Sequence, residues 1–457
     1  MRLSLKSITR EANFLSLAGN LSISLFGIVG FAILARSFST EVFGEWILFI
    51  SGGAFIEMFR FGITNTAIVR FLAGSDPEDR LSYIGSNGLI GLIVTVVIAL
   101  VMMLIWLAFP GPITHAGYRL FFVWYPLLAF INLPYNTALV IMQADLRFDR
   151  LFLLKFIESS GFLLVLIINF LFFHWSLDVL VWTYLFMNLV TSVFTMVKGW
   201  DGLKYIRKST RKTNKVILDF GKYTTFTLLG TNLLRNADTL IISLSPLGAA
   251  GVALYSIPMK LTELQQLPLR SFAATAFPKM SKASMQQDDA GWRSLFNTYS
   301  GAMTLLFIVM SLLVFIFADF LVLLLGGTQY VGTDALTGAN AATILRIFSI
   351  YGLLLPLDRM TGIGLDSRNH PDKNLIKVLF MVLTNVIGDL VAIFVFHSLE
   401  MVAVASVLFT LLGVLLGYYY VNREIHLHIP DVFKEGFDFY KSGYLKIREH
   451  FQSKKTV

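Results

Sequence analysis

The sequence contains no cysteine, and only 14% of its 457 residues are charged. Without cysteine the chain forms no disulfide, iron–sulfur cluster or thiolate zinc site, and it has no thiol nucleophile. Soluble domains are about 25% charged and about half apolar, whereas 56% of this sequence is hydrophobic and 41 residues are phenylalanine. The composition excludes an ordinary soluble protein and predicts a polytopic integral membrane protein.

Three further absences narrow the function. The sequence has no glycine-rich phosphate loop of the P-loop kind, so we do not expect ATP to be the direct energy source. His426 and His428 have no further ligand nearby, so we expect no metal and no other cofactor. No outer connection between apolar segments is long enough to carry a catalytic domain, which argues against an enzyme. Function should therefore lie within the membrane region.

Apolar stretches long enough to cross a bilayer recur along the whole chain. About 20 apolar residues are needed to span about 30 Å of hydrocarbon, and the sequence has about twelve such stretches. They cover residues 14–35, 43–70, 83–109, 119–143, 152–173, 177–197, 220–245, 250–277, 294–317, 336–362, 374–397 and 399–421. The basic opening precedes the first stretch without a cleavage signal, so we interpret that stretch as an uncleaved span. The sequence predicts an all-α protein with about twelve transmembrane helices.

Lys and Arg residues predict the orientation. If the twelve stretches cross in turn, most flanking basic residues fall on the side of both termini, and only Arg36 and Arg119 flank the other side. Because basic loops face the cytoplasm, we expect cytoplasmic N and C termini. The net charge of +8 then reflects orientation and contact with anionic lipids, and we expect no nucleic-acid partner.

A charged connection predicts two lobes. Residues 198–219 form a basic cytoplasmic linker between a six-helix lobe at 1–197 and another at 220–421, and residues 422–457 form an amphipathic cytoplasmic tail. A weak internal repeat relates residues 43–70 to residues 251–279, which suggests lobes related by an axis along the membrane normal with a central cavity between them. Prolines inside the spans predict kinks or hinges, and Gly85, Gly88 and Gly91 predict a helix packing seam.

Several stretches resemble a known family. Leu34-Ala35-Arg36, Phe43-Gly44, Phe61-Gly62-Ile63 and residues 67–70 form the first group. Residues 234–242, Gly248, Gly251, Tyr255-Ser256 and residues 277–281 form the second. The chain resembles the polysaccharide-exporting, O-antigen (Wzx-type) flippases of the multidrug/oligosaccharidyl-lipid/polysaccharide exporter superfamily. The resemblance implies a two-lobed carrier, expected to be a monomer of the bacterial plasma (inner) membrane. It would move a polyprenyl-pyrophosphate-linked oligosaccharide to the outer leaflet, with other polysaccharide-assembly proteins as candidate partners.

Charges inside the spans are the candidate site residues, because a charge at mid-helix costs about 2.5–3.5 kcal/mol unless it is paired or faces a cavity. Three i, i+3 couples have spacing that allows an ion pair on one helix, namely Glu57/Arg60, Arg235/Asp238 and Lys260/Glu263. Asp358 and Arg359 are adjacent and point about 100° apart. Asp389 is a further intramembrane acid. These acids are candidates for ion coupling or for structural ion pairs.

Two arginines have no acid within four residues. Guanidinium groups suit an anionic pyrophosphate, so we expect Arg270 and Arg346 to be its first ligands, followed by Arg60 and Arg235. An alternative for Arg346 is pairing with Asp389. Asn232, Asn236 and Thr239, with Ser243, follow one face of the seventh span and are candidate contacts for sugar hydroxyls or for another helix.

Two other functions stay open at this point. One is an ion-coupled exporter of drugs or small cations, which would use acidic residues in its cavity. The other, less favoured, is a membrane polysaccharide polymerase or glycosyltransferase. The sequence alone gives neither the glycan nor the energy source.

Overall fold

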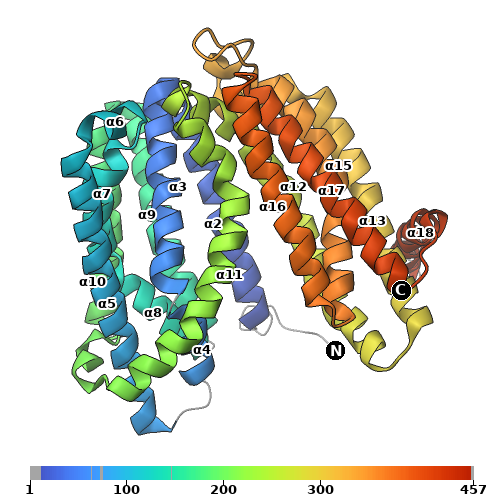
Figure 1. Cartoon of the computed structure of the whole chain (residues 1–457), viewed down its shortest axis with the longest axis horizontal. Coiled ribbons are helices and arrows are strands. Elements are labelled where there is room, and N and C mark those ends of the chain that lie inside the picture. The colour runs from blue at the N-terminus through green and yellow to red at the C-terminus, as the bar shows by residue number, and fades with distance from the viewer. Residues whose placement is uncertain (1–11, 63, 73–75, 146, 454–457) are drawn as a thin grey trace. The chain divides into compact units, whose positions relative to one another are not determined.

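The computed structural model describes residues 12–62, 64–72, 76–145 and 147–453. Within them the protein is all-α: the described part contains no sheet, and a single isolated bridge joins Thr333 to Asn340. Contacts divide the chain into two compact units, Met1–Ala253 and Leu254–Val457. Each unit is a bundle of long helices, coloured blue to green and yellow to red respectively in Figure 1.

The first unit contains the helices that line the site described below. In chain order its elements are α2 (Ala12–Ser37), α3 (Thr40–Gly62), α4 (Asn65–Leu72), α5 (Pro77–Ala108), α6 (Pro110–His115), α7 (Arg119–Ile131), α8 (Leu133–Ala144), α9 (Phe148–Ile168) with its π-helical end η1 (Asn169–Phe173), α10 (Leu177–Val197), η2 (Leu203–Lys208) and α11 (Arg211–Ser243).

The second unit begins within α12 (Gly248–Met285). The following elements are α13 (Asp289–Ile316), α14 (Ala318–Gly326), η3 (Thr328–Tyr330), α15 (Ala341–Ser367), α16 (Pro371–Phe394), α17 (Leu399–Glu424) and α18 (Ile429–Ser453). Its core is built around Trp292, which stacks on Phe296 and donates its indole N–H to Ser367 Oγ at 3.0 Å.

Helices occupy all twelve predicted spans. Among the described residues, eight helical segments are long and apolar enough to cross a membrane, and the bent pair α7 and α8 makes a ninth. The other three predicted spans are helical as α2, α11 and α12, and within α2 the described apolar part is the shorter Ile23–Ser37. The prediction of an all-helical polytopic membrane protein is confirmed, and a count of twelve crossings stays a prediction.

One predicted span is a bent pair of helices. The fourth span bends by 52° between α7 and α8, whereas α3 and α4 together make up the second span, Thr40–Leu72. Pro134 lies in the first turn of α8. Because proline has no amide hydrogen, it cannot donate a helical hydrogen bond to the carbonyl of Phe130, which favours a bend at this point. Pro258, Pro268 and Pro356 lie inside continuous helices.

The linker is held against the first unit. A Cβ at Gly85 of α5 would lie 2.1 Å from the carbonyl oxygen of Tyr205 in η2, so only glycine permits this approach. Ser82 Oγ donates to the carbonyl of Lys208, and Ser86 hydrogen-bonds Thr213. The predicted glycine seam is therefore a packing seam. By its contacts, α11 belongs to the first unit. The predicted lobes at 1–197 and 220–421 are groups of six membrane-crossing helices, and they stay a prediction.

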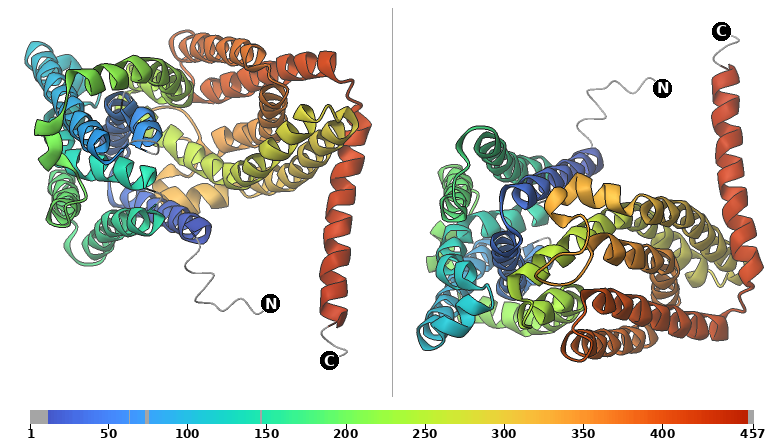
Figure 2. Two further views of the ribbon diagram at one scale, coloured as in Figure 1. Left: turned by 90° about the horizontal axis from the view of Figure 1, so that it is seen from below. Right: turned by 90° about the horizontal axis from the view of Figure 1, so that it is seen from above.

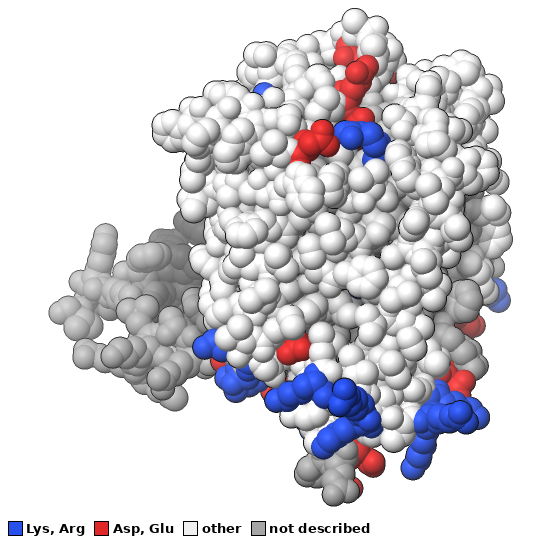
Figure 3. Space-filling view, turned by 90° about the vertical axis from the view of Figure 1, so that its left-hand side faces the viewer, with Lys and Arg blue, Asp and Glu red and all other residues white. Residues whose placement is uncertain are grey.

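Charges separate toward the two ends of the first unit. Figure 3 shows Lys and Arg gathered at its lower end, with acids and little basic charge at its upper end. Arg119 pairs with Asp178 at the start of α10, whereas Lys198 follows the other end of the same helix. Which end faces the cytoplasm stays a prediction from the flanking basic residues.

Candidate functional site

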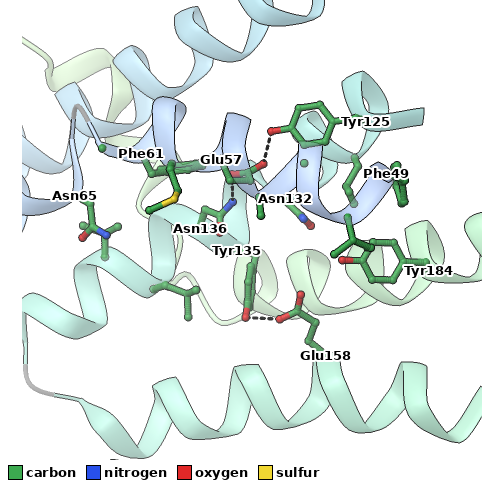
Figure 4. Close-up of a pocket in the computed structure, with 18 residues that line it drawn as sticks. Phe49, Glu57, Phe61, Asn65, Tyr125, Asn132, Tyr135, Asn136, Glu158 and Tyr184 are labelled. Carbon is green, nitrogen blue, oxygen red and sulfur yellow. Dashed lines mark hydrogen bonds between the residues drawn. The ribbon is translucent and has the colours of Figure 1, made fainter. Parts of the chain in front are cut away.

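The first unit has an open cavity of about 460 Å³ between helices that the hydropathy pattern places in the membrane. Its walls come from α3, α4, α7, α8, α9 and α10. Polar and aromatic side chains alternate around it (Figure 4). They include Phe49, Glu57, Phe61, Asn65, Tyr125, Asn132, Tyr135, Asn136, Glu158 and Tyr184. Among the described residues that line this cavity, none is Lys or Arg.

Glu57 is the hydrogen-bonding centre of one wall. Its Oε1 accepts from Tyr125 Oη at 2.9 Å, and its Oε2 accepts from Asn136 Nδ2 at 3.0 Å. Arg60, one turn along α3, donates to Oε1 as well. The carboxylate is thus fixed by α3, α7 and α8 together, and about a quarter of its side chain stays accessible.

Arg60 is a buried partner of Glu57. Its side chain is fully buried, and its second terminal nitrogen donates to Thr95 Oγ1 at 2.7 Å and to the carbonyl of Ala129 at 2.8 Å. The guanidinium therefore ties α3 to α5 and α7 behind the cavity wall. A role as pyrophosphate ligand, which stays a prediction, would require Arg60 to exchange these partners.

Glu158 forms the facing wall together with Tyr135. Tyr135 Oη donates to Glu158 Oε2 across the gap between α8 and α9, and Tyr184 of α10 lines the cavity beside them (Figure 4). Glu158 is not among the candidate site residues of the sequence analysis. The signal that sequence reasoning missed is three-dimensional, since the bend before Pro134 presents Tyr135 to α9.

Two asparagines provide amide groups to the same cavity. Asn136 is bound to Glu57, whereas Asn132 sits at the bend between α7 and α8, where its Oδ1 is buried without a hydrogen-bond partner among the described residues. A buried acceptor without a donor costs about 1–3 kcal/mol. A ligand hydroxyl in the cavity would supply the missing donor.

The predicted polar face of the seventh span lies on α11. Asn236 and Thr239 line a second, smaller cavity of about 150 Å³ together with Ser51, Phe55 and Tyr118 of the first unit. Ser243 shares a hydrogen bond of 2.9 Å with Tyr118 Oη. Asp238 is buried and has interaction partners. The side chains of Asn232 and Arg235 lie outside the described residues.

Charged residues of the second unit have different surroundings. Lys260 Nζ lies 3.1 Å from Glu263 Oε2, one turn along α12. Arg346 of α15 pairs with Asp319 of α14, an acid that the sequence analysis did not connect with it. Arg270 of α12 is exposed and makes no hydrogen bond or ion pair with the described residues. The structure thus leaves Arg270 with a free guanidinium within the described part of the chain.

Two charged residues of α16, Asp389 and Lys377, are buried. Asp389 is fully buried and accepts from Asn385 Nδ2 at 3.1 Å. Lys377, which sequence reasoning did not single out, is buried and donates to Asp358 Oδ1 at 2.8 Å and to the Asp358 carbonyl at 3.0 Å. Asp358 therefore pairs across helices rather than with its neighbour Arg359. No group of three or more His, Asp or Glu among the described residues is placed to hold a metal ion.

Solved structures with the same fold are transporters. The lipid II flippase MurJ in an inward closed conformation has a TM-score of 0.72 at 13% identity, covering 93% of this chain and 90% of that one. An inward-facing multidrug resistance MATE family transporter of the MOP superfamily has a TM-score of 0.70 at 16% identity, covering 91% and 99%. A MOP superfamily transporter from Pyrococcus furiosus gives 0.53 at 15% identity, covering 89% and 93%. The protein therefore has the MOP transporter fold.

Residues 10–284 match the family described as polysaccharide biosynthesis protein, and the chain belongs to that family. A search of curated proteins finds no match. The family match confirms the resemblance to polysaccharide-related proteins stated from the sequence, and the multi-pass membrane fold is the one seen in MurJ and MATE transporters.

Proposed function

We propose that the protein is a flippase that moves a polyprenyl-pyrophosphate-linked oligosaccharide from the cytoplasmic to the outer leaflet for surface polysaccharide synthesis of the O-antigen kind. Its place is the bacterial inner membrane, with both termini in the cytoplasm. Membership of the polysaccharide biosynthesis family supports a glycan cargo. The fold shared with a lipid II flippase supports a lipid-linked one.

The observation that carries the proposal is the chemistry of the cavity in the first unit. Sugars present hydroxyl groups that both donate and accept, together with apolar ring faces that pack on aromatic side chains. The cavity offers carboxylate and amide groups from Glu57, Asn132, Asn136 and Glu158 beside aromatic walls. A site built to hydrogen-bond hydroxyl groups suits a glycan better than a purely apolar drug.

The pyrophosphate needs a different set of residues. Carboxylates repel an anion, so Glu57 and Glu158 disfavour the pyrophosphate within the cavity itself. Arg270 is the first candidate ligand, because its guanidinium is exposed and uses no partner among the described residues. Arg346 would have to release Asp319 before it could bind the head group. Arg60 and Arg235 follow as weaker candidates.

Membrane potential is a sufficient driving force for this cargo. A pyrophosphate diester carries about two negative charges out of an interior-negative cytoplasm, which gains about 4.6 kcal/mol at about 100 mV. Glu57, Asp238, Glu263 and Asp389 could couple an ion instead. Glu57 and Glu263 each have a basic partner within one turn, so a structural ion pair is the alternative role of both.

The test is glycan export in cells that depend on the protein. Asn136→Leu removes a cavity amide while keeping the size of the side chain, and Asn422→Leu is a matched change outside the cavity. We expect export to fall for Asn136→Leu and to persist for Asn422→Leu at equal membrane abundance. Normal export by Asn136→Leu would remove the cavity from the proposed site.

A drug or cation exporter is the second candidate, and the observation in its favour is the pair of carboxylates in a cavity lined, among its described residues, without Lys or Arg. The two functions differ in their effect on the sensitivity of cells to toxic compounds. An exporter of toxic cations should lower the sensitivity of cells to such compounds, and Glu57→Gln should abolish that protection. Full glycan export without any change in drug sensitivity would exclude this candidate.

A further inference from the structure

Helix α18 has a docked face and an exposed aromatic face. Its first turns pack on α13, where a Cβ at Gly301 would lie 1.8 Å from the carbonyl oxygen of Val432. Gly436 of α18 meets the same point of α13. The two helices thus cross at backbone contact, which fixes which side of α18 faces the bundle.

Polar bonds hold the crossing in place. Glu435 accepts hydrogen bonds from Ser294 Oγ at 2.7 Å, Asn297 Nδ2 at 3.0 Å and Thr298 Oγ1 at 3.2 Å. On the other side of the crossing, Tyr440 Oη donates to the carbonyl of Ala302 at 2.8 Å. One carboxylate therefore gathers three donors of α13, so α18 is a fixed part of the second unit.

The direction of α18 differs from that of its neighbours. In Figure 1 the helices of the second unit run up the page, while α18 is seen nearly end-on. Both views of Figure 2 show α18 along its length, crossing the direction in which the other helices of the second unit are drawn. If α13 crosses the bilayer, α18 therefore runs along the membrane plane.

The level of the crossing is set by the sequence of α13. Its first part, Asp289–Ser300, carries charged and polar residues, and its second part, Gly301–Ile316, contains no Asp, Glu, Lys or Arg. Ile308, Val309 and Leu312 are exposed on that second part, as on a lipid-facing helix. The crossing at Gly301 therefore lies where the apolar part begins, which is the level of a membrane interface.

Aromatic side chains stand exposed at this level. Phe433 is 43% and Phe437 is 64% exposed, and their i, i+4 spacing puts both on one face, next to the docked face of Val432 and Gly436. Lys434 and Lys441 are also exposed. Around the helix, the phenylalanines lie between these lysines and the docked face. Aromatic residues bordered by lysines are typical of helices that lie in the interface of a bilayer.

We propose that α18 is an interfacial helix whose Phe433 and Phe437 insert into the lipid leaflet on the side where α13 begins, while Glu435 holds the helix at that level. The partner is the phospholipid surface itself, and Lys434 and Lys441 contact its phosphates. The inference depends on the geometry of the second unit and not on the transported substrate.

The absence of cysteine makes the test direct. The full chain is reconstituted with one nitroxide label, at Phe433→Cys, Phe437→Cys or the exposed control Asp438→Cys. Vesicles are phosphatidylcholine with and without phosphatidylglycerol. We expect labels at the two phenylalanine positions to collide more with oxygen than with a water-soluble nickel chelate, and Asp438→Cys to show the reverse. Added phosphatidylglycerol should deepen the first two labels.

Three outcomes overturn the proposal. Equal nickel access at all three positions would place the aromatic face in water. Dipolar broadening that grows with the ratio of protein to lipid would show that a second copy covers this face. In the third, Glu435→Ala leaves both mobility and depth of the Phe437→Cys label unchanged, which removes Glu435 as the anchor. Asp431→Asn, an exposed acid on the same helix, is the matched control for Glu435→Ala.

Discussion

Glu57 and Arg60 give the sharpest test of the cavity wall, because they differ in exposure. Replacing Glu57 by Gln keeps its shape and one acceptor oxygen but leaves a fully buried guanidinium opposite a neutral group. Removing one partner of a buried ion pair destabilises a protein by about 3–5 kcal/mol. For Glu57→Gln we expect a loss near the lower end of this range, because Gln retains an acceptor oxygen. Arg60→Met alone leaves a carboxylate without its counter-ion, but this change should be less costly than Glu57→Gln, because the carboxylate still accepts from Tyr125 and Asn136.

The double variant separates the two roles. If the residues are mainly partners, Glu57→Gln with Arg60→Met should be less destabilised than the sum of the single changes by about 1–3 kcal/mol, as for residues in direct contact. The assay is chemical or thermal unfolding of purified protein in one detergent, with glycan export measured in parallel. Additive free energies of unfolding would refute the ion pair as drawn. A stable double variant that exports nothing would instead show that the pair also serves transport.

Three further predictions address topology, head-group binding and energy. Single cysteines replacing Lys204 and Asp334 should react with an impermeant thiol reagent only from the cytoplasmic and the outer side respectively, and reaction from the opposite sides would invert the assigned orientation. Arg270→Ala should abolish export with partial rescue by Lys, which lacks the bidentate fork, while Arg423→Ala should export normally; an active Arg270→Ala removes this ligand. Flipping in proteoliposomes should depend on membrane potential and persist without a proton or sodium gradient, and unchanged flipping after collapse of the potential would return coupling to the carboxylates.

The sequence predicted the helices well because span length is set by bilayer thickness. Each apolar stretch is helical, and the glycine seam on α5 is a packing seam. The breaks were harder to predict. A proline can leave a helix continuous, as Pro258 does in α12, or accompany a bend, as Pro134 does at the start of α8. The difference depends on neighbouring helices, which a single sequence does not give.

Site residues were predicted where the partner is local and missed where it is distant. Lys260 and Glu263 lie one turn apart, so their spacing suggested the contact. Arg346 meets Asp319 from another helix, and Lys377 meets Asp358 across the α15 and α16 pair. Glu158 was not a candidate, yet it lines the cavity and accepts a hydrogen bond from Tyr135 of α8. Patterns along one helix cannot show such contacts.

The two units carry different chemistry, and this difference bears on how one cargo could be recognised. The cavity of the first unit offers carboxylates, amides and aromatic rings, which suit neutral hydroxyl groups and repel phosphate. The second unit offers Arg270, whose guanidinium is exposed. A lipid-linked oligosaccharide has both kinds of group in one molecule, a neutral glycan and an anionic pyrophosphate. If the two sites act on these separate parts, Asn136→Leu should discriminate between cargoes that differ in sugar while Arg270→Ala impairs all of them equally. If the loss of export depended on the sugar in the same way for both variants, the two sites would not act on separate parts of the cargo.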